Sequence, residues 1–285
     1  MGAEIIYGVG DFRGDSYFLS EMARESKAEV ILFAGVVFMA ETAKIISPAA
    51  TVIVPDRGSG CSLADSIDGE GVRRLKALYP GATVVCYINS SAEVKAESDV
   101  CVTSANVYDI VASTPTDQVL FVPDRLMADN VRAELARRGI KKNIISSDGT
   151  CLVHDAFTPA DIVAARAQFP GIRVVSHPEC TADVAAASDF VGSTGAMMKY
   201  VKETIAPYFL MLTECGLVGR LEVEAPDKHF VGGCRLCPYM KLNSLEKIRD
   251  ALACPRPDQI VELEEGLRIR ASRCIERMFE LTPAN

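Results

Sequence analysis

Apolar runs of strand length alternate with amphipathic segments of helical length along most of this chain. The runs are continuous in their apolar character, which is typical of strands covered on both faces, as in parallel sheets. Strict alternation of strand and helix predicts an α/β protein built from layers. We expect buried parallel strands at residues 30–34, 51–54, 83–88, 118–122, 143–145, 173–175 and 208–212.

The amphipathic segments between these runs predict the helices of the layers. They cover residues 17–27, 41–46, 66–78, 129–138, 158–169 and 194–206. The C-terminal part is different, because residues 244–253 and 258–280 have helical character with no strand between them. We expect these last two helices to pack across the outside.

Length and charge limit the classes of protein to consider. A chain of 285 residues is long enough for two or three domains with large cores. Thirty basic against 38 acidic residues give a net charge of −8, and no block of Lys or Arg stands out, which argues against a nucleic-acid partner. The N-terminus has no secretory pattern and no apolar stretch approaches the roughly 20 residues of a membrane span, so we expect a cytoplasmic protein without a membrane partner.

Ten cysteines in a reducing compartment should be thiols, and disulfides are not expected. Packing explains Cys86, Cys215, Cys254 and Cys274 best, because they lie in or beside apolar segments. The positions of Cys101 and Cys180 near loop starts leave both packing and chemistry open.

Three other cysteines, Cys61, Cys151 and Cys237, lie on glycine-containing loops at separations of 90 and 86 residues. Such spacing suggests one thiol from each of three units and differs from the local pairs of zinc fingers. A three-thiolate site suits an iron–sulfur cubane with one iron free of protein ligands, with structural zinc and inert thiols as the alternatives. The Cys234-x-x-Cys237 spacing also permits a regulatory disulfide.

A weak internal repeat accompanies the cysteine spacing. Val54-Pro-Asp-Arg57 recurs as Val122-Pro-Asp-Arg125, and the related Pro226-Asp-Lys228 appears later.

Polar loops follow several of the predicted strands. Hydroxyls and amides at strand ends and helix starts can hold anions, and they can equally be simple helix caps. Four such loops together favour a multiply anionic ligand. They contain Ser16, Tyr87 with Asn89 and Ser90, Ser104 with Asn106, and Ser193 with Thr194.

Two of the three histidines fit acid–base chemistry. His177-Pro-Glu179 follows a strand at the edge where α/β proteins bind ligands. His154 lies three residues after Cys151 and either lines the same cavity or caps a helix. His229 is expected at the surface.

Taken in order, the longer motifs resemble those of the quinolinate synthase family. The match extends from about Asp11 to Leu252. The motifs are Gly35-Val-Val-Phe-Met-Ala-Glu-Thr-Ala-Lys44, Gly60-Cys-Ser-Leu-Ala-Asp65, Tyr87-Ile-Asn-Ser-Ser-Ala-Glu-Val-Lys-Ala96, Cys151-Leu-Val-His154, His177-Pro-Glu-Cys180, Gly192-Ser-Thr194, Thr213-Glu214 and Cys237-Pro-Tyr-Met-Lys241.

The resemblance implies three similar αβα domains around a pseudo-threefold axis, at residues 1–79, 80–166 and 167–253, with residues 254–285 as a C-terminal helix outside them. It implies a [4Fe–4S] cluster held by Cys61, Cys151 and Cys237, with Cys180 not a ligand. It also implies condensation of iminoaspartate, supplied by aspartate oxidase or aspartate dehydrogenase, with dihydroxyacetone phosphate to form quinolinate for NAD biosynthesis, with loss of phosphate and water.

The resemblance also gives each polar loop a role. Tyr87 and Asn89 would orient the intermediate, and His177 and Glu179 would move protons. Carboxylates or phosphate would bind to Ser16, Ser104, Ser193 and Thr194, with His154 lining the same site.

One departure from the family pattern is visible. Members begin with a further strand ending in His-Tyr-Tyr or His-Asn-Tyr, and the sequence given does not contain it. The flanks of Tyr7 do not reproduce that motif, so the role of the family's tyrosine is not carried over to it. The alternative function is therefore a truncated or divergent relative that binds or senses small molecules through an iron–sulfur centre.

Overall fold

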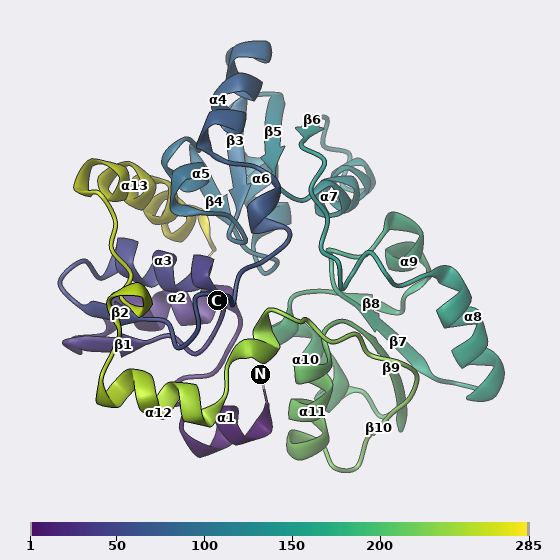
Figure 1. The fold of residues 1–285 in the computed structure, drawn as a ribbon. Helices are drawn as coiled ribbons and strands as arrows, with labels where there is room; N and C mark the ends of the chain where they lie inside the picture. The colour runs from purple at the N-terminus through teal and green to yellow at the C-terminus, as the bar shows by residue number, and fades with distance from the viewer. Residues whose placement is uncertain (1, 284–285) are drawn as a thin grey trace.

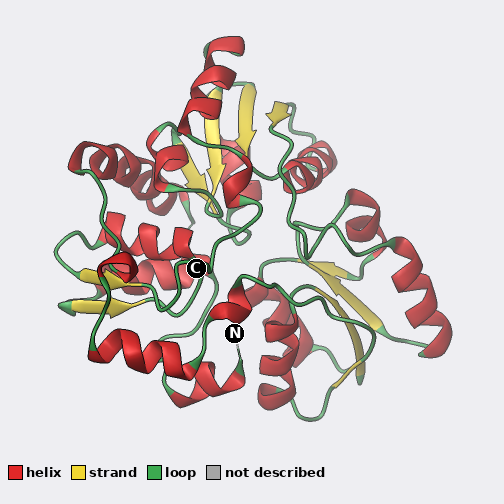
Figure 2. Ribbon diagram, in the orientation of Figure 1, coloured by secondary structure: helices red, strands yellow, loops and turns green. Residues whose placement is uncertain are grey.

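The computed structural model describes residues 2–283 and contains three β-sheets, each flanked by helices (Figure 1, Figure 2). Every strand pair in them is parallel, which confirms the predicted α/β class. The strand orders are β1–β2, β4–β3–β5–β6 and β10–β9–β7–β8. The strands are β1 (Val30–Leu32), β2 (Thr51–Ile53), β3 (Thr83–Tyr87), β4 (Val100–Val102), β5 (Gln118–Val122), β6 (Asn143–Ser146), β7 (Arg173–Ser176), β8 (Phe190–Val191), β9 (Tyr208–Leu212) and β10 (His229–Phe230).

All seven predicted strands are present, with small shifts at their ends. The sequence prediction missed β4, β8 and β10, which have only two or three residues each. Runs this short carry too little periodicity to be separated from loop. They complete the second and third sheets, so these sheets are wider than the sequence indicated.

Helices cover the sheets, and several begin at a side chain that accepts a backbone N–H in the first turn. Asp15, Asp68 and Asp124 do so at the starts of α2, α4 and α7, and Ser193 at the start of α10. The helices are α1 (Ala3–Gly8), α2 (Ser16–Glu25), α3 (Val37–Ile46), α4 (Gly69–Leu78), α5 (Ala92–Ala96), α6 (Val107–Ser113), α7 (Arg125–Arg137), α8 (Pro159–Gln168), α9 (Ala182–Ala187), α10 (Thr194–Glu203), α11 (Cys215–Glu224), α12 (Leu245–Ala253) and α13 (Glu265–Leu281), with 3₁₀ turns η1 (Ala64–Ser66), η2 (Met240–Leu242) and η3 (Pro257–Gln259).

The largest hydrophobic core surrounds the second sheet and includes one face of α13. Ala271, Cys274, Ile275 and Met278 of that helix are fully buried in this core. Because α13 contacts α3 as well as α5 and β4, it joins the helices of the first sheet to the second sheet. Figure 1 shows it along the outer side of these elements, in yellow. Cys86 and Cys274 are buried as expected, whereas Cys254 is exposed and the packing role predicted for it is wrong.

The three sheets with their helices surround a central region that is crossed by loops (Figure 1). The carboxyl ends of parallel strands lie at one edge of a sheet, where α/β proteins bind ligands. The predicted polar residues follow β3, β4, β7 and β8 directly, so they lie at such edges. Among the described residues, no helix has both the length and the apolar character needed to cross a bilayer.

Candidate active site and metal centre

Cys61, Cys151 and Cys237 have the same local backbone, although they are far apart in the sequence. Each cysteine carbonyl accepts the N–H of the residue four positions later, which forms a single helical turn. We name these the three cysteine turns. Their hydrogen bonds run from Asp65 N to Cys61 O (3.0 Å), from Asp155 N to Cys151 O (2.9 Å) and from Lys241 N to Cys237 O (3.3 Å).

The sulfurs of these turns influence one another electrostatically. Burial, with smaller effects of the charges of Glu179 and Cys237, raises the pKa of the Cys61 thiol to about 12. Burial and the charge of Glu179 also raise the pKa of Cys151, with Cys61 adding to the effect. Backbone N–H groups oppose the rise at both sulfurs, because they stabilise a thiolate. Each of these thiols binds metal only by releasing its proton.

A buried group of polar side chains adjoins Cys151. We name it the carboxylate–imidazole cluster, and it consists of Tyr87, His154, His177, Glu179 and Thr213. His154 Nδ1 lies 3.1 Å from Glu179 Oε2 and 3.3 Å from Cys151 Sγ. Donor atoms of Cys151, His154 and Glu179 all lie within 4.8 Å of one another, a spacing that could hold a metal ion. Cys151 thus belongs both to this group and to the three cysteine turns.

Glu179 receives hydrogen bonds or close contacts from both sides. The Tyr87 hydroxyl donates to Glu179 Oε1 at 2.7 Å, and His177 Nδ1 lies 3.5 Å from the same oxygen. Burial alone would raise the pKa of Glu179, but the charge and hydrogen bond of His154 outweigh it, and the pKa falls well below its usual range. The hydrogen bond from the Tyr87 hydroxyl adds to this lowering. Glu179 is therefore an ionised carboxylate in a buried setting.

Burial sets the protonation states of His177 and Tyr87 in this cluster. Burial lowers the pKa of His177 to about 3, so its imidazole is neutral. Burial and the charge of Glu179 raise the pKa of Tyr87, so its hydroxyl keeps its proton. The two imidazole rings stack with centroids 4.8 Å apart. A neutral imidazole beside a carboxylate and a phenol can accept and return protons.

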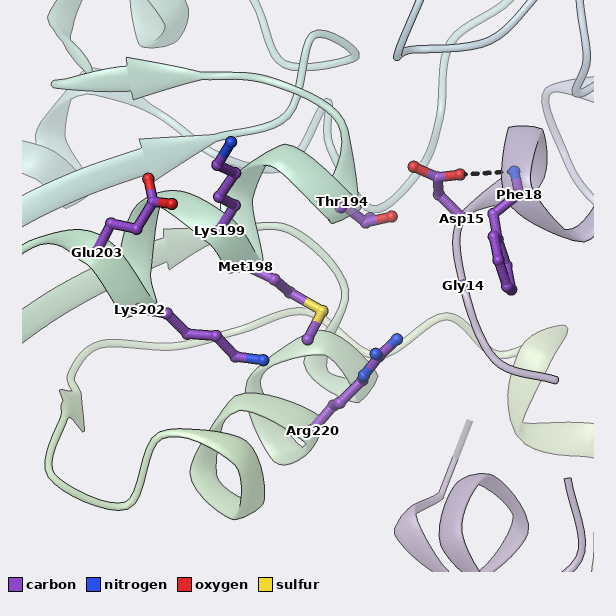
Figure 3. Close-up of a pocket in the computed structure, with 10 residues that line it drawn as sticks. Gly14, Asp15, Phe18, Thr194, Met198, Lys199, Lys202, Glu203 and Arg220 are labelled. Carbon is purple, nitrogen blue, oxygen red and sulfur yellow. Dashed lines mark hydrogen bonds between the residues drawn. The ribbon is translucent and has the colours of Figure 1, made fainter. Parts of the chain in front are cut away.

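One predicted residue, Thr194, lines an open cavity of about 420 Å³, and Ser16 and Ser193 are sequence neighbours of residues that line it (Figure 3). Thr194, at the start of α10, lines it opposite Gly14 and Asp15, which precede Ser16. A Cβ built on Gly195 would come within 3.0 Å of Asp15 Oδ2, so the starts of α2 and α10 are in close contact. The Ser193 hydroxyl accepts the N–H of Ala196 at 3.3 Å and so caps α10, which was one of the two interpretations of this loop from the sequence. Ser16, Ser193 and Thr194 therefore belong to one place in the fold.

The remaining predicted residues lie at the ends of strands of the second sheet. Asn89 follows β3 closely and Ser104 follows β4, both partly buried. Tyr7 is elsewhere, because its hydroxyl donates to Glu224 Oε1 of α11 at 2.9 Å.

Three residues that contact or adjoin the carboxylate–imidazole cluster were not identified from the sequence. Thr213 Oγ1 lies 3.1 Å from His154 Nε2, although its motif had been recognised without a role. Asn130 Nδ2 donates to the carbonyls of Pro178 and Cys180, both at 2.7 Å, and so fixes the turn that carries Glu179. Asp124 is fully buried, and in its ionised form it would raise the pKa of Tyr87. Asp124 lies in the repeated Val-Pro-Asp-Arg segment, to which no role was given, and Asn130 lies within a helix whose sequence pattern is ordinary.

The expectation that all ten cysteines are thiols is wrong. Cys215 and Cys234 form a disulfide, 19 residues apart in the sequence. The Cys215 N–H donates to the Arg235 carbonyl at 3.1 Å, and Glu214 pairs with Arg235 as an isolated parallel bridge. The disulfide and these two contacts hold the loop that precedes Cys237 against the start of α11. The expected packing role of Cys215 is therefore also wrong, and Cys237 remains a free thiol.

The fold and the site together define an α/β enzyme in which a buried group of imidazoles, a carboxylate and a cysteine joins the second sheet to the third. The model of a family described as quinolinate synthetase A protein matches residues 2–280. The chain belongs to this family, whose members use an iron–sulfur cluster and act on small molecules.

Curated relatives agree with the family assignment. Quinolinate synthase 2 of Mesorhizobium japonicum is 46% identical over 276 residues, which cover 97% of this chain and 83% of the relative. Quinolinate synthase of Caulobacter vibrioides is 42% identical over 287 residues, covering 99% and 76%. Quinolinate synthase of Xylella fastidiosa is 44% identical over 278 residues, covering 98% and 80%. Nothing in these comparisons favours the alternative of a divergent binding or sensing protein.

Proposed function

We propose that this enzyme condenses iminoaspartate with dihydroxyacetone phosphate to form quinolinate, with loss of phosphate and water, in NAD biosynthesis. The observation that carries the proposal is the contact of Glu179 with Tyr87, His154 and His177 beside Cys151. Condensation, isomerisation and dehydration each need protons moved at defined atoms. A buried carboxylate, a neutral imidazole and a protonated phenol can do so.

The cofactor that fits these residues is a [4Fe–4S] cluster held by Cys61, Cys151 and Cys237. Three partly buried thiols on equivalent turns supply a matched set of soft ligands, and backbone N–H groups directed at Cys61 and Cys151 would stabilise their thiolates. An iron without a protein ligand would supply Lewis-acid chemistry for the loss of water. Cys180 is not a ligand in this proposal, because its fully buried thiol donates to the Leu212 carbonyl.

Each predicted residue has a task in this reaction. Glu179 accepts a proton from the substrate carbon, and His177, neutral at working pH, passes protons to and from the intermediate. Tyr87 and Asn89 orient that intermediate through the phenol and the amide. Ser16, Ser104, Ser193 and Thr194 hold carboxylates or phosphate, and His154, fixed by Thr213, lines the site.

The setting of the reaction is proposed on the same basis. Aspartate oxidase or aspartate dehydrogenase would supply the unstable imine, and the cytoplasm would be the compartment. The domains would be residues 1–79, 80–166 and 167–253, each with one of the three sheets, followed by residues 254–285 with α13.

Anaerobic reconstitution with iron and sulfide, followed by dihydroxyacetone phosphate and freshly generated iminoaspartate, tests the activity. Quinolinate and inorganic phosphate should appear together and in proportion. Phosphate release without quinolinate, or neither product from a cluster-loaded enzyme, would reject the proposal.

A further inference from the structure

An acidic residue follows the strand that leads toward each cysteine turn. Asp56 comes after β2, Asp124 after β5 and Glu214 after β9. Each of these acids also contacts the residue two positions before its cysteine. The contacts are Ser59 N to Asp56 O (3.1 Å), the bridge between Asp124 and Gly149, and the bridge between Glu214 and Arg235.

This equivalence corrects the third member of the sequence repeat. Pro226-Asp-Lys228 follows the end of α11, so it has a different place in the fold from Asp56 and Asp124. Glu214 occupies the matching position in the third sheet. The three acids can therefore be compared directly.

Two of the three acids have a lysine partner, and the third does not. Lys247 Nζ lies 2.5 Å from Asp56 Oδ2, and Lys241 Nζ lies 3.5 Å from Glu214 Oε1. Within residues 2–283, Asp124 forms an ion pair with no basic side chain, since the guanidinium of neighbouring Arg125 pairs with Asp129. A buried acid without a counter-charge is costly when ionised.

The carboxyl of Asp124 is fully buried, and only one of its oxygens has a partner. Oδ1 accepts the N–H of Met127 at 3.0 Å as the cap of α7. Oδ2 has no hydrogen-bond partner among the described residues. Buried polar atoms are nearly always paired in proteins, so this oxygen requires an explanation.

The charged and titratable groups that face Asp124 come from several elements. They are Glu179 after β7, Tyr87 at the end of β3, Cys180 before α9 and Arg125 in α7. Burial raises the pKa of Asp124 well above its usual range, and the charge of Glu179 raises it further, against the smaller effects of the backbone N–H groups of Met127 and Leu126 and of Arg125. When the pKa values of two nearby carboxyl groups are shifted in opposite directions, one group is ionised and the other protonated; here Glu179 is the ionised group and Asp124 the protonated one.

We propose that Asp124 is a further substrate-binding residue, in which a protonated Oδ2 donates a hydrogen bond to an oxygen of the condensing substrate beside Tyr87 and Glu179. This inference rests on the proposed function. Oδ1 accepts a hydrogen bond from the first turn of α7, and Oδ2 donates one to the substrate, so a single side chain both caps the helix and binds the ligand. The substrate class is an oxygen-rich anion, because a neutral acid can donate to a carboxylate or carbonyl that the ionised Glu179 would repel.

Two substitutions separate the donor role from the helix cap. Asp124→Asn keeps the cap and retains N–H donors in place of the acid proton, so its kcat/KM should stay within about 3-fold of the wild-type value. Asp124→Ser keeps a cap but has no second polar atom, and kcat/KM should fall about 10- to 100-fold with normal iron content. The matched control is Asp68→Ser at the exposed start of α4, where the side chain accepts from Gly71 N and activity should not change.

Two results would overturn this role. Wild-type activity in Asp124→Ser would mean that the residue is a cap only. Loss of activity in Asp124→Asn with an intact cluster would mean that a carboxylate, not a donor, is needed.

Infrared difference spectra of the full chain give a readout besides activity. A protonated-carboxyl band that is present in the wild type at neutral pH and missing in Asp124→Asn is expected, even if Asp124→Ser does not fold. No such band in the wild type would overturn the inference. If the wild type forms no quinolinate but shows the band, the proposed function fails while the neutral carboxyl stands.

Discussion

The Tyr87 hydroxyl at the end of β3 donates a 2.7 Å hydrogen bond to Oε1 of Glu179, which follows β7. The bond links the second sheet to the third across 92 residues of sequence. Both side chains are buried, with exposed fractions of 3% each. The phenol stabilises the charged form of the carboxylate, so these two residues set each other's protonation state.

Tyr87→Phe removes this donor with little change in shape. The pKa of Glu179 should rise, because a hydrogen bond that lowered it is lost. The acid limb of the kcat/KM profile should then move to higher pH, with a fall of about 10²-fold at the optimum. Tyr79→Phe, at the end of α4, is the control, and an unchanged pH profile in Tyr87→Phe would contradict the role of this bond.

Replacing any one of Cys61, Cys151 and Cys237 by Ala should abolish the brown absorbance and the bound iron of the reconstituted protein. Three ligands leave no spare thiolate, so one loss is enough. Cys180→Ala should keep the cluster and cost about 1 kcal/mol of unfolding free energy. Cys254 is exposed, so Cys254→Ala is the control for the loss of a cysteine during purification and reconstitution, and this variant should keep its iron. Iron loss in Cys180→Ala with retention in Cys61→Ala would reverse the ligand assignment.

Alkylation of the unfolded, unreduced protein should modify eight of its ten cysteines, because Cys215 and Cys234 are bonded. After reduction all ten should react. Peptide mapping should find the protected pair in the segments around Cys215 and Cys234. A protected Cys237 would instead favour the Cys234–Cys237 pairing that the sequence spacing permits.

Asn130→Ala should lower kcat about 10-fold, with a smaller change in KM. Its side chain fixes the carbonyls on both sides of Glu179, and a loosened turn misplaces the carboxylate. Unfolding free energy should fall by about 1–3 kcal/mol, since buried carbonyls lose their donor. Gln259→Ala removes a buried amide that donates to the Pro55 carbonyl at 2.7 Å. This control should lose stability alone; an equal kcat loss in both variants would argue against positioning by Asn130.

Glu224 joins α1, α10 and α11, and its contribution should depend on pH. Burial opposes ionisation, but hydrogen bonds from Lys202, Arg220 and Tyr7 lower the pKa of Glu224 to about 2. A depressed pKa stabilises the fold above the unfolded value of 4.5, and this stabilisation is lost as pH falls from 4.5 toward 2.

Glu224→Gln should therefore cost about 1–2 kcal/mol in urea unfolding at neutral pH and progressively less in acid. Exposed Glu222→Gln on the same helix should have no effect. If the difference in unfolding free energy between Glu224→Gln and the wild type did not change with pH, the effect would come from packing and not from the charge of Glu224.

The sequence alone was enough for the α/β class, the main strands and the residues at their ends. Continuous apolar runs such as residues 118–122 can be satisfied only by burial on both faces, and this requirement is local. The glycine-containing loops likewise selected Cys61, Cys151 and Cys237, whose turns have one backbone pattern. Short β4 escaped prediction because three residues carry too weak a pattern.

Tertiary structure alone decided which of these side chains meet. The partners of Glu179 come from β3, from the turn after Cys151 and from its own loop, and no spacing rule relates them. The same holds for the Cys215–Cys234 disulfide and for Asp124 Oδ2, which has no hydrogen-bond partner among the residues that the structure describes. Periodicity reports how each segment is buried, whereas protonation and bonding depend on distances between segments, which arise only when the sheets pack together.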